Sequence, residues 1–318
     1  MAGESLSFAA QVKDELSHEI PALDCCRRME LAGLLRASGR LELGGPGRLA
    51  VVFSTDHAPV ARKILKLMRL TFGLQTVTMV TRRRRLRKNL AYAVRVPPQP
   101  GLPEMLRATG IIDEEGSLLE WADLPELEAD HCRRAYLRGT FLGSGWVAPP
   151  ERQHHLEMAT ASTEAADAIG QMLFGYGINI RVAARKELLI LYLKDAGHVT
   201  RFLGLVGATD SLLHYEDVRA MKDMKNLVNR QVNAETANLN KTVEAAARQV
   251  EALERFLSLG GFARLPGTLR ELAALRINHP EASLKELGEL CNPPLSKSAV
   301  NHRMRQLMQV ASREPQSL

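Results

Sequence analysis

The sequence predicts an α+β protein in which an α-β-β-α-β-β-α unit occurs twice and is followed by an all-α domain. Three observations support this prediction. Helical and strand patterns follow one another in the same order in residues 8–109 and 130–206. Each of these units contains a similar helical segment with a glycine in it. The end of the chain contains short amphipathic segments that each follow a serine or threonine able to cap a helix.

Length and composition indicate an ordinary globular protein. The 318 residues, 45% of them hydrophobic, are enough for two or three domains with buried cores. No apolar run has the length that spans a bilayer, and residues 1–20 mix charged with apolar side chains, unlike a signal peptide. We therefore expect a cytoplasmic protein without a membrane partner.

The cysteines are predicted to be reduced and mostly buried. Cys25, Cys26, Cys132 and Cys291 lack the C-x-x-C spacing of a zinc site, and four cysteines in so long a chain argue against a disulfide framework. The sequence therefore predicts no metal and no cofactor.

Basic and acidic residues are segregated along the chain. The formal net charge of +6 is by itself a weak indication of a polyanionic partner. Residues 76–96 hold seven basic residues and no acidic one, whereas residues 104–130 hold nine acidic residues and one basic one. This segregation favours one surface that contacts phosphate groups. The basic residues expected there are Arg82, Arg83, Arg84, Arg85, Arg87 and Lys88.

Caps, turns and periodicity define the first unit. Ser7 can cap the opening helix, the Gly-Gly-Pro-Gly turn at 44–47 separates two strands, and Gly73 ends the helix before the second hairpin. The arginine-rich segment lies at the tip of that second hairpin. The predicted elements are helix 8–18, helix 28–38, strands 40–43 and 49–54, helix 59–72, strands 76–83 and 90–96, and helix 103–109.

The second unit repeats this order. Two prolines at 149–150 lie in the turn of its first hairpin, Ser162 can cap its middle helix, and Tyr176-Gly177 at the end of that helix matches Phe72-Gly73. A protein with pseudo-twofold symmetry shows such a repeat. The predicted elements are helix 130–142, strands 145–147 and 154–160, a helix from Ser162 to Tyr176-Gly177, strands 179–185 and 188–193, and helix 196–206.

Two segments, LAGLLRASG at 31–39 and LRGTFLGSG at 137–145, resemble the LAGLIDADG motif of homing endonucleases. In that motif small residues let two helices pack closely, and a penultimate aspartate holds the metal ion at the DNA. The resemblance implies that Gly33 and Gly139 lie at a seam between two halves, whose sheets form a saddle with a polar, basic concave face for duplex DNA. Ser38 and Ser144 replace the metal-binding acids, so we expect no catalytic residue.

Two alternatives to this interpretation stay open. Either segment alone is also compatible with ordinary packing between amphipathic helices. In addition, Glu30, Glu42 and Glu157 lie near the motif positions. A displaced carboxylate among them would leave an active metal-dependent homing-type endonuclease as the alternative function.

The segment 229–241, NRQVNAETANLNK, has weak helix propensity because asparagine side chains compete for backbone hydrogen bonds. We predict an interdomain linker here, followed by a helix over 242–259 that ends at two glycines. Two interpretations of the segment remain. It is either a solvated hinge or a contact with phosphate or a partner through Arg230, Asn233, Asn238 and Lys241.

Three capped helices predict a helix-turn-helix domain at the end of the chain. Glu286 stands where it completes a capping box with Ser283. The predicted helices are 269–278 after Thr268, 284–290 after Ser283, and 297–310 after Ser296. The expected core consists of Leu269, Leu272, Leu275, Leu284, Leu287, Leu290, Val300, Met304 and Leu307.

The last of these helices has a polar outer face that suits DNA. Arginine and lysine bond guanine edges or phosphates, asparagine pairs with adenine, and the helix N-terminus favours phosphate. A three-helix bundle with an ordinary solvated face is the alternative. The residues expected to contact double-stranded DNA are Lys297, Ser298, Asn301, His302 and Arg305, with Arg303 near the edge of the core.

Taken together, four features resemble the WhiA family of bacterial transcription regulators, and the resemblance covers essentially the whole chain. They are the helix 8–18, the Cys25-Cys26 pair, the asparagine-rich run 229–241 and the terminal module 296–305. The resemblance implies roles in sporulation control, cell division and chromosome segregation. It also implies a degenerate homing-endonuclease domain over 1–220, a linker and connecting helix over 221–259, and a helix-turn-helix domain over 260–318.

From these patterns we expect a sequence-specific DNA-binding transcription regulator without nuclease activity, associated with the nucleoid. Its expected partners are double-stranded DNA and another transcription regulator, with no small-molecule substrate. Besides the endonuclease, the alternative is a protein-partner scaffold whose first domain does not touch DNA.

Overall fold

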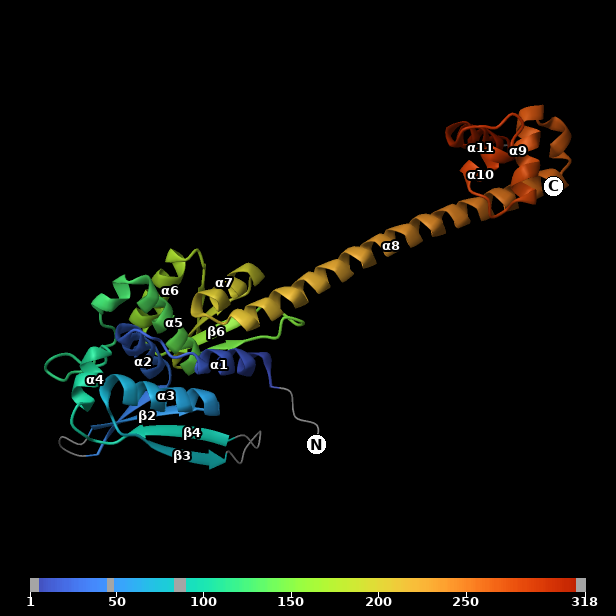
Figure 1. Ribbon diagram of the computed structural model, residues 1–318. Helices are drawn as coiled ribbons and strands as arrows, with labels where there is room; N and C mark the ends of the chain where they lie inside the picture. Colours follow the sequence, from blue (N-terminus) through green and yellow to red (C-terminus); the bar gives the residue numbers. More distant parts are fainter. Residues whose placement is uncertain (1–5, 45–48, 83–89, 313–318) are drawn as a thin grey trace. The chain divides into compact units, whose positions relative to one another are not determined.

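The computed structural model describes residues 6–44, 49–82 and 90–312. The chain forms two compact units, Met1–Lys222 and Asp223–Leu318 (Figure 1). The first unit contains two antiparallel sheets and their helices, and the described part of the second unit is helical. The predicted α+β class, with a duplicated first part and an all-α second part, is confirmed.

The first half of unit 1 follows the predicted order of elements. Its strands form one antiparallel sheet in the order β1-β2-β4-β3, and α3 packs against this sheet. The elements are α1 (Phe8–His18), α2 (Asp24–Ser38), β1 (Gly39–Leu43), β2 (Leu49–Thr55), α3 (Ala58–Phe72), β3 (Val77–Arg82), β4 (Leu90–Val96) and α4 (Leu102–Ala108).

The second half repeats the first. Its sheet has the equivalent strand order, β5-β6-β8-β7, so the predicted duplication is confirmed. A short 3-10 helix, η1 (Pro125–Glu128), precedes this half. The other elements are α5 (Asp130–Ser144), β5 (Trp146–Val147), β6 (Leu156–Thr160), α6 (Thr163–Gly175), β7 (Arg181–Arg185), β8 (Leu188–Leu193) and α7 (Ala196–Val206).

The same local signals begin and end helices in both halves. The hydroxyls of Ser7 and Ser162 accept hydrogen bonds from backbone amides three residues later, at 3.3 and 3.1 Å. Gly73 and Gly177 adopt left-handed backbone conformations, with φ of 64° and 68°. A side chain is disfavoured in that conformation, so glycine lets the chain leave each helix abruptly. The predicted caps are confirmed.

Several predicted bounds shift. α2 begins four residues before its predicted start, because Asp24 pairs with Arg28 one turn later at 3.5 Å and supports the first turn. α5 continues through Ser144, two residues beyond its predicted end. β6 and β7 begin at Leu156 and Arg181, each two residues later than predicted.

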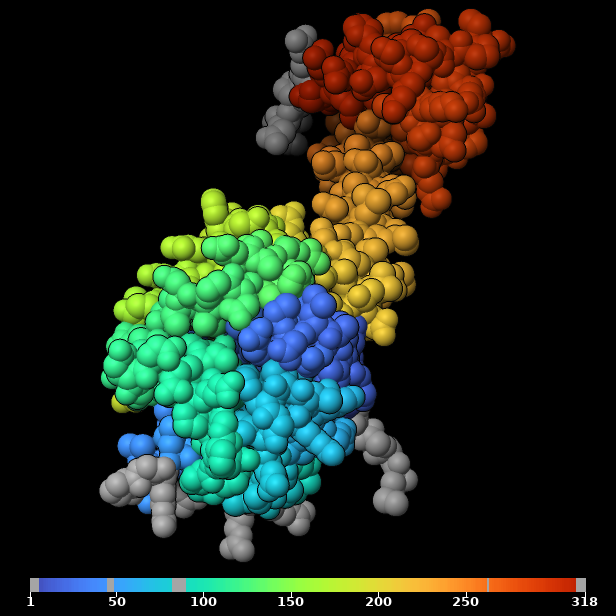
Figure 2. All heavy atoms as spheres, turned by 60° about the vertical axis from the view of Figure 1, so that its left-hand side comes forward, coloured from blue at the N-terminus to red at the C-terminus, as the bar shows by residue number. Residues whose placement is uncertain are grey.

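One hydrophobic core joins the two halves of unit 1. In Figure 2 the start of the chain, with α1 and α2 in dark blue, lies between the light-blue rest of the first half and the green second half. Val12 and Leu16 of α1 and Leu31 and Leu34 of α2 have no exposed surface. Along β6, buried residues alternate with half-buried ones, because one face of the sheet meets the core and the other faces outward.

A single helix, α8 (Thr209–Ser258), contains 50 residues and runs from unit 1 into unit 2. The segment 229–241 is helical despite its weak helix propensity, so the predicted start of a helix at 242 is wrong. Its asparagines are exposed, where the propensity cost is only about 0.5–0.7 kcal/mol per residue relative to alanine. Side-chain pairs one turn apart support the helix, namely Gln231–Glu235 at 3.2 Å, Glu244–Arg248 at 3.7 Å and Glu251–Arg255 at 3.0 Å.

Unit 2 packs three helices against the end of α8. They are α9 (Gly267–Asn278), α10 (Leu284–Leu290) and α11 (Lys297–Ser312), and a 3-10 turn, η2 (Gly261–Arg264), leads into them. Leu253 and Phe256 of α8 are buried in the same core as Leu272, Leu287 and Leu307. Part of the predicted connecting helix thus belongs to this core.

The caps of unit 2 follow the prediction except in α9. That helix begins at Gly267 after Pro266, so Thr268 lies inside it instead of capping it. The capping box of Ser283 and Glu286 is present, and the Ser296 hydroxyl accepts from the Ala299 amide at 3.2 Å.

Leu290 is a core prediction that the structure contradicts. Its side chain is 47% exposed. Leu287, Gly288 and Cys291 are the buried positions of this segment, and the helical period turns Leu290 away from the face that they share.

Candidate nucleic-acid interface

Helices α2 and α5 meet at backbone contact. A Cβ atom on Gly33 would lie 2.2 Å from the carbonyl oxygen of Tyr136, and one on Gly139 would lie 2.0 Å from the carbonyl oxygen of Glu30. Side-chain carbons do not approach backbone this closely, so both positions require glycine. The structure thus brings Gly33 and Gly139 together at the seam, in equivalent positions of the two halves.

Ser38 and Ser144 end the two seam helices, and their hydroxyls bond to backbone. Ser38 Oγ donates to the carbonyl of Leu34 at 2.9 Å. Ser144 Oγ donates to the carbonyl of Ala159 at 2.8 Å and accepts from its amide at 3.1 Å, which fastens the end of α5 to β6. Neither hydroxyl offers the negative charge that holds a divalent cation against phosphate.

Glu30 lies in the core, out of reach of a metal ion at a DNA surface. Its side chain has no exposed surface and pairs with Lys63 Nζ and, at 3.6 Å, with Arg138 Nη1. Arg138 also lies 3.5 Å from Glu19 and donates from Nε to the carbonyl of Val206 at 2.8 Å. Burial raises the pKa of Glu30 and lowers the pKa of Lys63, and their mutual attraction opposes both shifts.

The other two acids considered for metal binding lie on different sheets. Glu42 pairs with Arg40 at 2.8 Å and with Arg95 at 3.3 Å, and Glu157 Oε2 lies 3.3 Å from Nε2 of His155. Within the described residues, neither belongs to a cluster of three or more side chains that could hold a metal ion. The geometry therefore disfavours the displaced carboxylate.

The outer face of the second sheet combines aromatic rings with cations. Strand register places one residue from each strand in a row: Trp146, Glu157, Tyr192 and Arg181. His155 stacks on Tyr192 with ring centroids 6.0 Å apart, and Lys194 Nζ lies 5.3 Å from the centre of the Tyr192 ring. Trp146, Arg181 and Lys194 are exposed. This face therefore exposes positive charge next to aromatic rings.

The arginine-rich segment is only partly described. Arg82 ends β3, whereas Arg83, Arg84, Arg85, Arg87 and Lys88 lie outside the described residues. The other basic residue predicted outside the terminal domain, Arg230, is exposed on α8, where its Nε donates to the carbonyl of Asn226 at 3.3 Å.

Helix α11 separates an apolar face from a polar one. Val300, Met304 and Leu307 are buried in the core of unit 2. The predicted contact residues lie on the other side of the helix or at its edge. Lys297, Ser298, His302 and Arg305 are exposed, and Asn301 and Arg303 are half-buried.

Gly288 is a structural residue of the helix-turn-helix domain that was not among the predicted residues. The amide of Leu295 donates to its carbonyl at 2.8 Å, and a Cβ on Gly288 would lie 2.3 Å from the carbonyl oxygen of Leu295. The glycine therefore lets the turn before α11 fold back onto α10. A lone glycine inside a predicted helix was the available signal.

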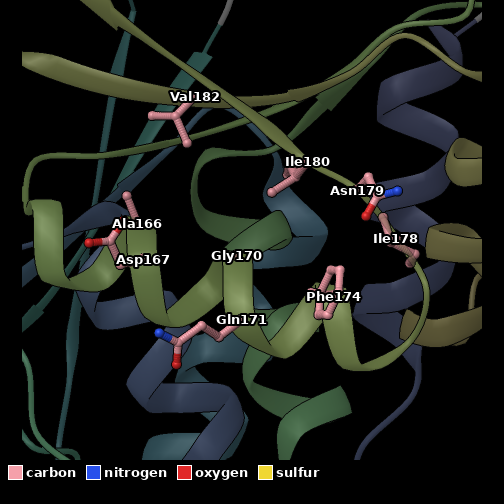
Figure 3. A pocket seen from close by; sticks show the side chains of 9 residues that line it. All are labelled: Ala166, Asp167, Gly170, Gln171, Phe174, Ile178, Asn179, Ile180 and Val182. Atoms are coloured by element: carbon pink, nitrogen blue, oxygen red, sulfur yellow. The ribbon is translucent and has the colours of Figure 1, made fainter.

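Unit 1 also has a shallow pocket of about 400 Å³ between α6 and the start of β7 (Figure 3). Its lining is mostly apolar, with Phe174, Ile178, Ile180 and Val182 around it. Among the nine described residues that line it, Asp167 alone is ionisable. This lining does not pair a nucleophile with a base.

The seam also brings together cysteines that are far apart in the sequence. Cys25 and Cys26 begin α2, and His131 and Cys132 begin α5. Their four potential ligand atoms all lie within 4.8 Å of one another. Ligand spacing within a single segment of the sequence does not reveal this cluster, because its members come from two segments. The available signal was the repeated pattern DCCRR at 24–28 and DHCRR at 130–134.

Fold and seam together define a protein with a duplicated LAGLIDADG-like domain and a terminal helix-turn-helix domain. Three family descriptions match the chain: the WhiA N-terminal LAGLIDADG-like domain over residues 24–112, the WhiA LAGLIDADG-like domain over 133–225, and the WhiA C-terminal HTH domain over 228–311. The chain belongs to the WhiA family, as the sequence resemblance predicts.

Relatives and solved structures agree with this assignment. The chain is 61% identical to the "Probable cell division protein WhiA" of Symbiobacterium thermophilum, covering 97% of this chain and 98% of the relative. It is 44% identical to the protein of the same name from Heliobacterium modesticaldum, covering 96% of each. The fold resembles "full-length DUF199/WhiA from Thermatoga maritima", with a TM-score of 0.61, 23% identity, and coverage of 99% and 100%. No helix in the described part of the chain combines the length and hydropathy needed to cross a membrane.

Proposed function

We propose that this protein is a sequence-specific DNA-binding transcription regulator that does not cleave DNA. The observation that supports this most directly is the polar, basic face of α11 within a domain that matches the WhiA helix-turn-helix description. Its relatives are named as probable cell division proteins. We extend the proposal to cell division, sporulation and chromosome segregation, with the protein acting at the nucleoid in the cytoplasm.

The same proposal assigns the parts of the chain. Residues 260–318 read base edges in the major groove through Lys297, Ser298, Asn301, His302, Arg303 and Arg305. Residues 1–220 add phosphate contacts, and 221–259 connect the two domains. The arginine-rich segment 82–88 and Arg230 contribute further charge. Burial of Glu30 and the hydroxyls at 38 and 144 support binding without scission.

Substituting Asn301 or Arg305 with alanine is expected to weaken a specific duplex roughly 10- to 100-fold, because a bidentate base contact contributes about 1–3 kcal/mol. Random duplex should lose far less. The measurement is the Kd of the full chain for a duplex selected from a random pool and for scrambled DNA. Gln309→Ala, an exposed change on the same helix, is the matched control. Equal loss on both duplexes would show that α11 only positions the protein.

Replacing both Arg181 and Lys194 with alanine is expected to weaken binding to every duplex alike and to reduce the salt slope of log Kd by about one to two, because two phosphate contacts are lost. A salt titration of the full chain measures this. Arg107→Ala, which removes a cation that pairs with Glu114 at 3.6 Å, is the control. Unchanged affinity and slope would favour the alternative, in which the first domain binds a protein such as another transcription regulator.

A further inference from the structure

We propose that Cys25, Cys26, His131 and Cys132 form a zinc site that fastens the N-terminal ends of the seam helices α2 and α5. Two ligands come from each helix, and each pair stands in the first turn. The site lies at the end of the seam opposite Ser38 and Ser144. Cys25 and Ser38 are 13 residues apart on α2, which corresponds to about 20 Å along the helix axis. It is therefore distinct from the position where the homing endonucleases hold their metal.

The spacing of the ligand atoms suits a tetrahedral ion. Nδ1 of His131 lies 3.2 Å from Sγ of Cys26 and 3.3 Å from Sγ of Cys132, and Cys25 Sγ completes a group within 4.8 Å. Zinc bonds of about 2.3 Å to sulfur and 2.0–2.1 Å to nitrogen place tetrahedral ligands roughly 3.5–3.8 Å apart. Small side-chain rotations bring the four atoms to that geometry.

The donor set selects the kind of metal. Three thiolates and one imidazole are the ligands of structural zinc sites, whereas magnesium and calcium prefer oxygen. On binding, each thiol gives its proton to solvent, and His131 coordinates as neutral imidazole through Nδ1. Cys26 and Cys132 are 7% and 1% exposed, while His131 is exposed, so the ion enters from the histidine side.

The four ligands lie in the first turns of two helices, where the helix dipole favours the negative charge that three thiolates bring. The pattern DCCRR/DHCRR also places two arginines directly after the ligands in each helix. Arg28 and Arg134 pair with Asp24 and Asp130 of their own helices, at 3.5 and 2.9 Å.

Metal content of the full-length chain tests the proposal. We expect one zinc ion per chain by elemental analysis, loss of that ion in Cys132→Ser and in Cys25→Ser, and retention in Cys291→Ser. Cys291 is the matched control because it is a buried cysteine in unit 2, whose thiol donates to the carbonyl of Leu287 at 3.2 Å. Cys25 is half-buried, so Cys25→Ser keeps the test informative if Cys132→Ser fails to fold.

Two further readouts do not depend on DNA binding. Co²⁺ added to the zinc-free chain should give the visible absorption of a tetrahedral thiolate complex. Zn²⁺, but not Mg²⁺, should raise the melting temperature of unit 1 by about 5 °C or more. The proposal is overturned if the zinc-free chain gives no such absorption, or if Cys25→Ser and Cys132→Ser both retain the ion. A mass lower by two hydrogens under non-reducing conditions would instead assign a disulfide and overturn it as well.

Discussion

Gly139→Ala is expected to destabilise unit 1 by about 3 kcal/mol or more, because the added methyl group overlaps the backbone of α2. The new Cβ would lie 2.0 Å from the carbonyl oxygen of Glu30 and 3.0 Å from the amide of Leu34. Backbone atoms cannot rotate away as a side chain does, so the two seam helices must move apart. Urea unfolding measures the loss. Both tryptophans, Trp121 and Trp146, belong to unit 1, so their fluorescence reports on this unit alone.

The matched control is Gly170→Ala, a glycine inside helix α6. A Cβ there would meet nothing closer than the Ile180 methyl at 3.9 Å. Alanine restricts the unfolded chain and favours the helix, so this variant should be as stable as the parent or up to about 1 kcal/mol more stable. Equal unfolding midpoints for Gly139→Ala and Gly170→Ala would contradict the backbone contact at the seam.

Lys63→Met is expected to cost about 3–5 kcal/mol, because it leaves the Glu30 carboxylate buried without its nearest cation. The remaining partner, Arg138, lies 3.6 Å away and is shared with Glu19. The double variant Glu30→Gln with Lys63→Met removes both charges and should recover most of the loss. Tryptophan fluorescence during urea unfolding again gives the free energies.

Arg40→Ala is the control, because it breaks an ion pair that is exposed to solvent instead of buried. Arg40 pairs with Glu42 at 2.8 Å, but its side chain is 67% exposed, so its removal should change stability by less than about 1 kcal/mol. The single variant Glu30→Gln completes the comparison. If the losses of unfolding free energy in Lys63→Met and Glu30→Gln simply add up in the double variant, Glu30 and Lys63 do not stabilise each other, which would contradict the buried ion pair.

Local signals in the sequence predicted most of the fold. Ser7, Ser162, Ser283 and Ser296 cap helices as expected, and the order of elements repeats in both halves. Each cap and each helix or strand pattern depends on a few neighbouring residues, so the sequence alone predicts them. The continuity of α8 was missed for the opposite reason. Its asparagines weaken the helix slightly at each position, and neighbouring side-chain pairs together with the packed end in unit 2 outweigh that cost.

In the candidate site, too, the features set by neighbouring residues could be predicted, and those set by distant residues could not. Gly33 and Gly139 stood out because the motif marks them, and the polar face of α11 follows from helical periodicity. The burial of Glu30 could not be predicted, because it depends on Lys63 and Arg138 from two other helices. The cysteine cluster depends on the pseudo-twofold axis, which brings distant residues into contact, such as Cys26 and His131, which are 105 positions apart.

Because both copies of the repeat belong to one polypeptide, their association does not depend on protein concentration, and each copy has been free to diverge. A true homodimer presents identical residues across its axis. Here Cys26 faces its counterpart Cys132, but Cys25 corresponds to His131. Two identical subunits related by a twofold axis can supply only even numbers of each donor, so three sulfurs and one nitrogen can meet here only because the two halves differ in sequence.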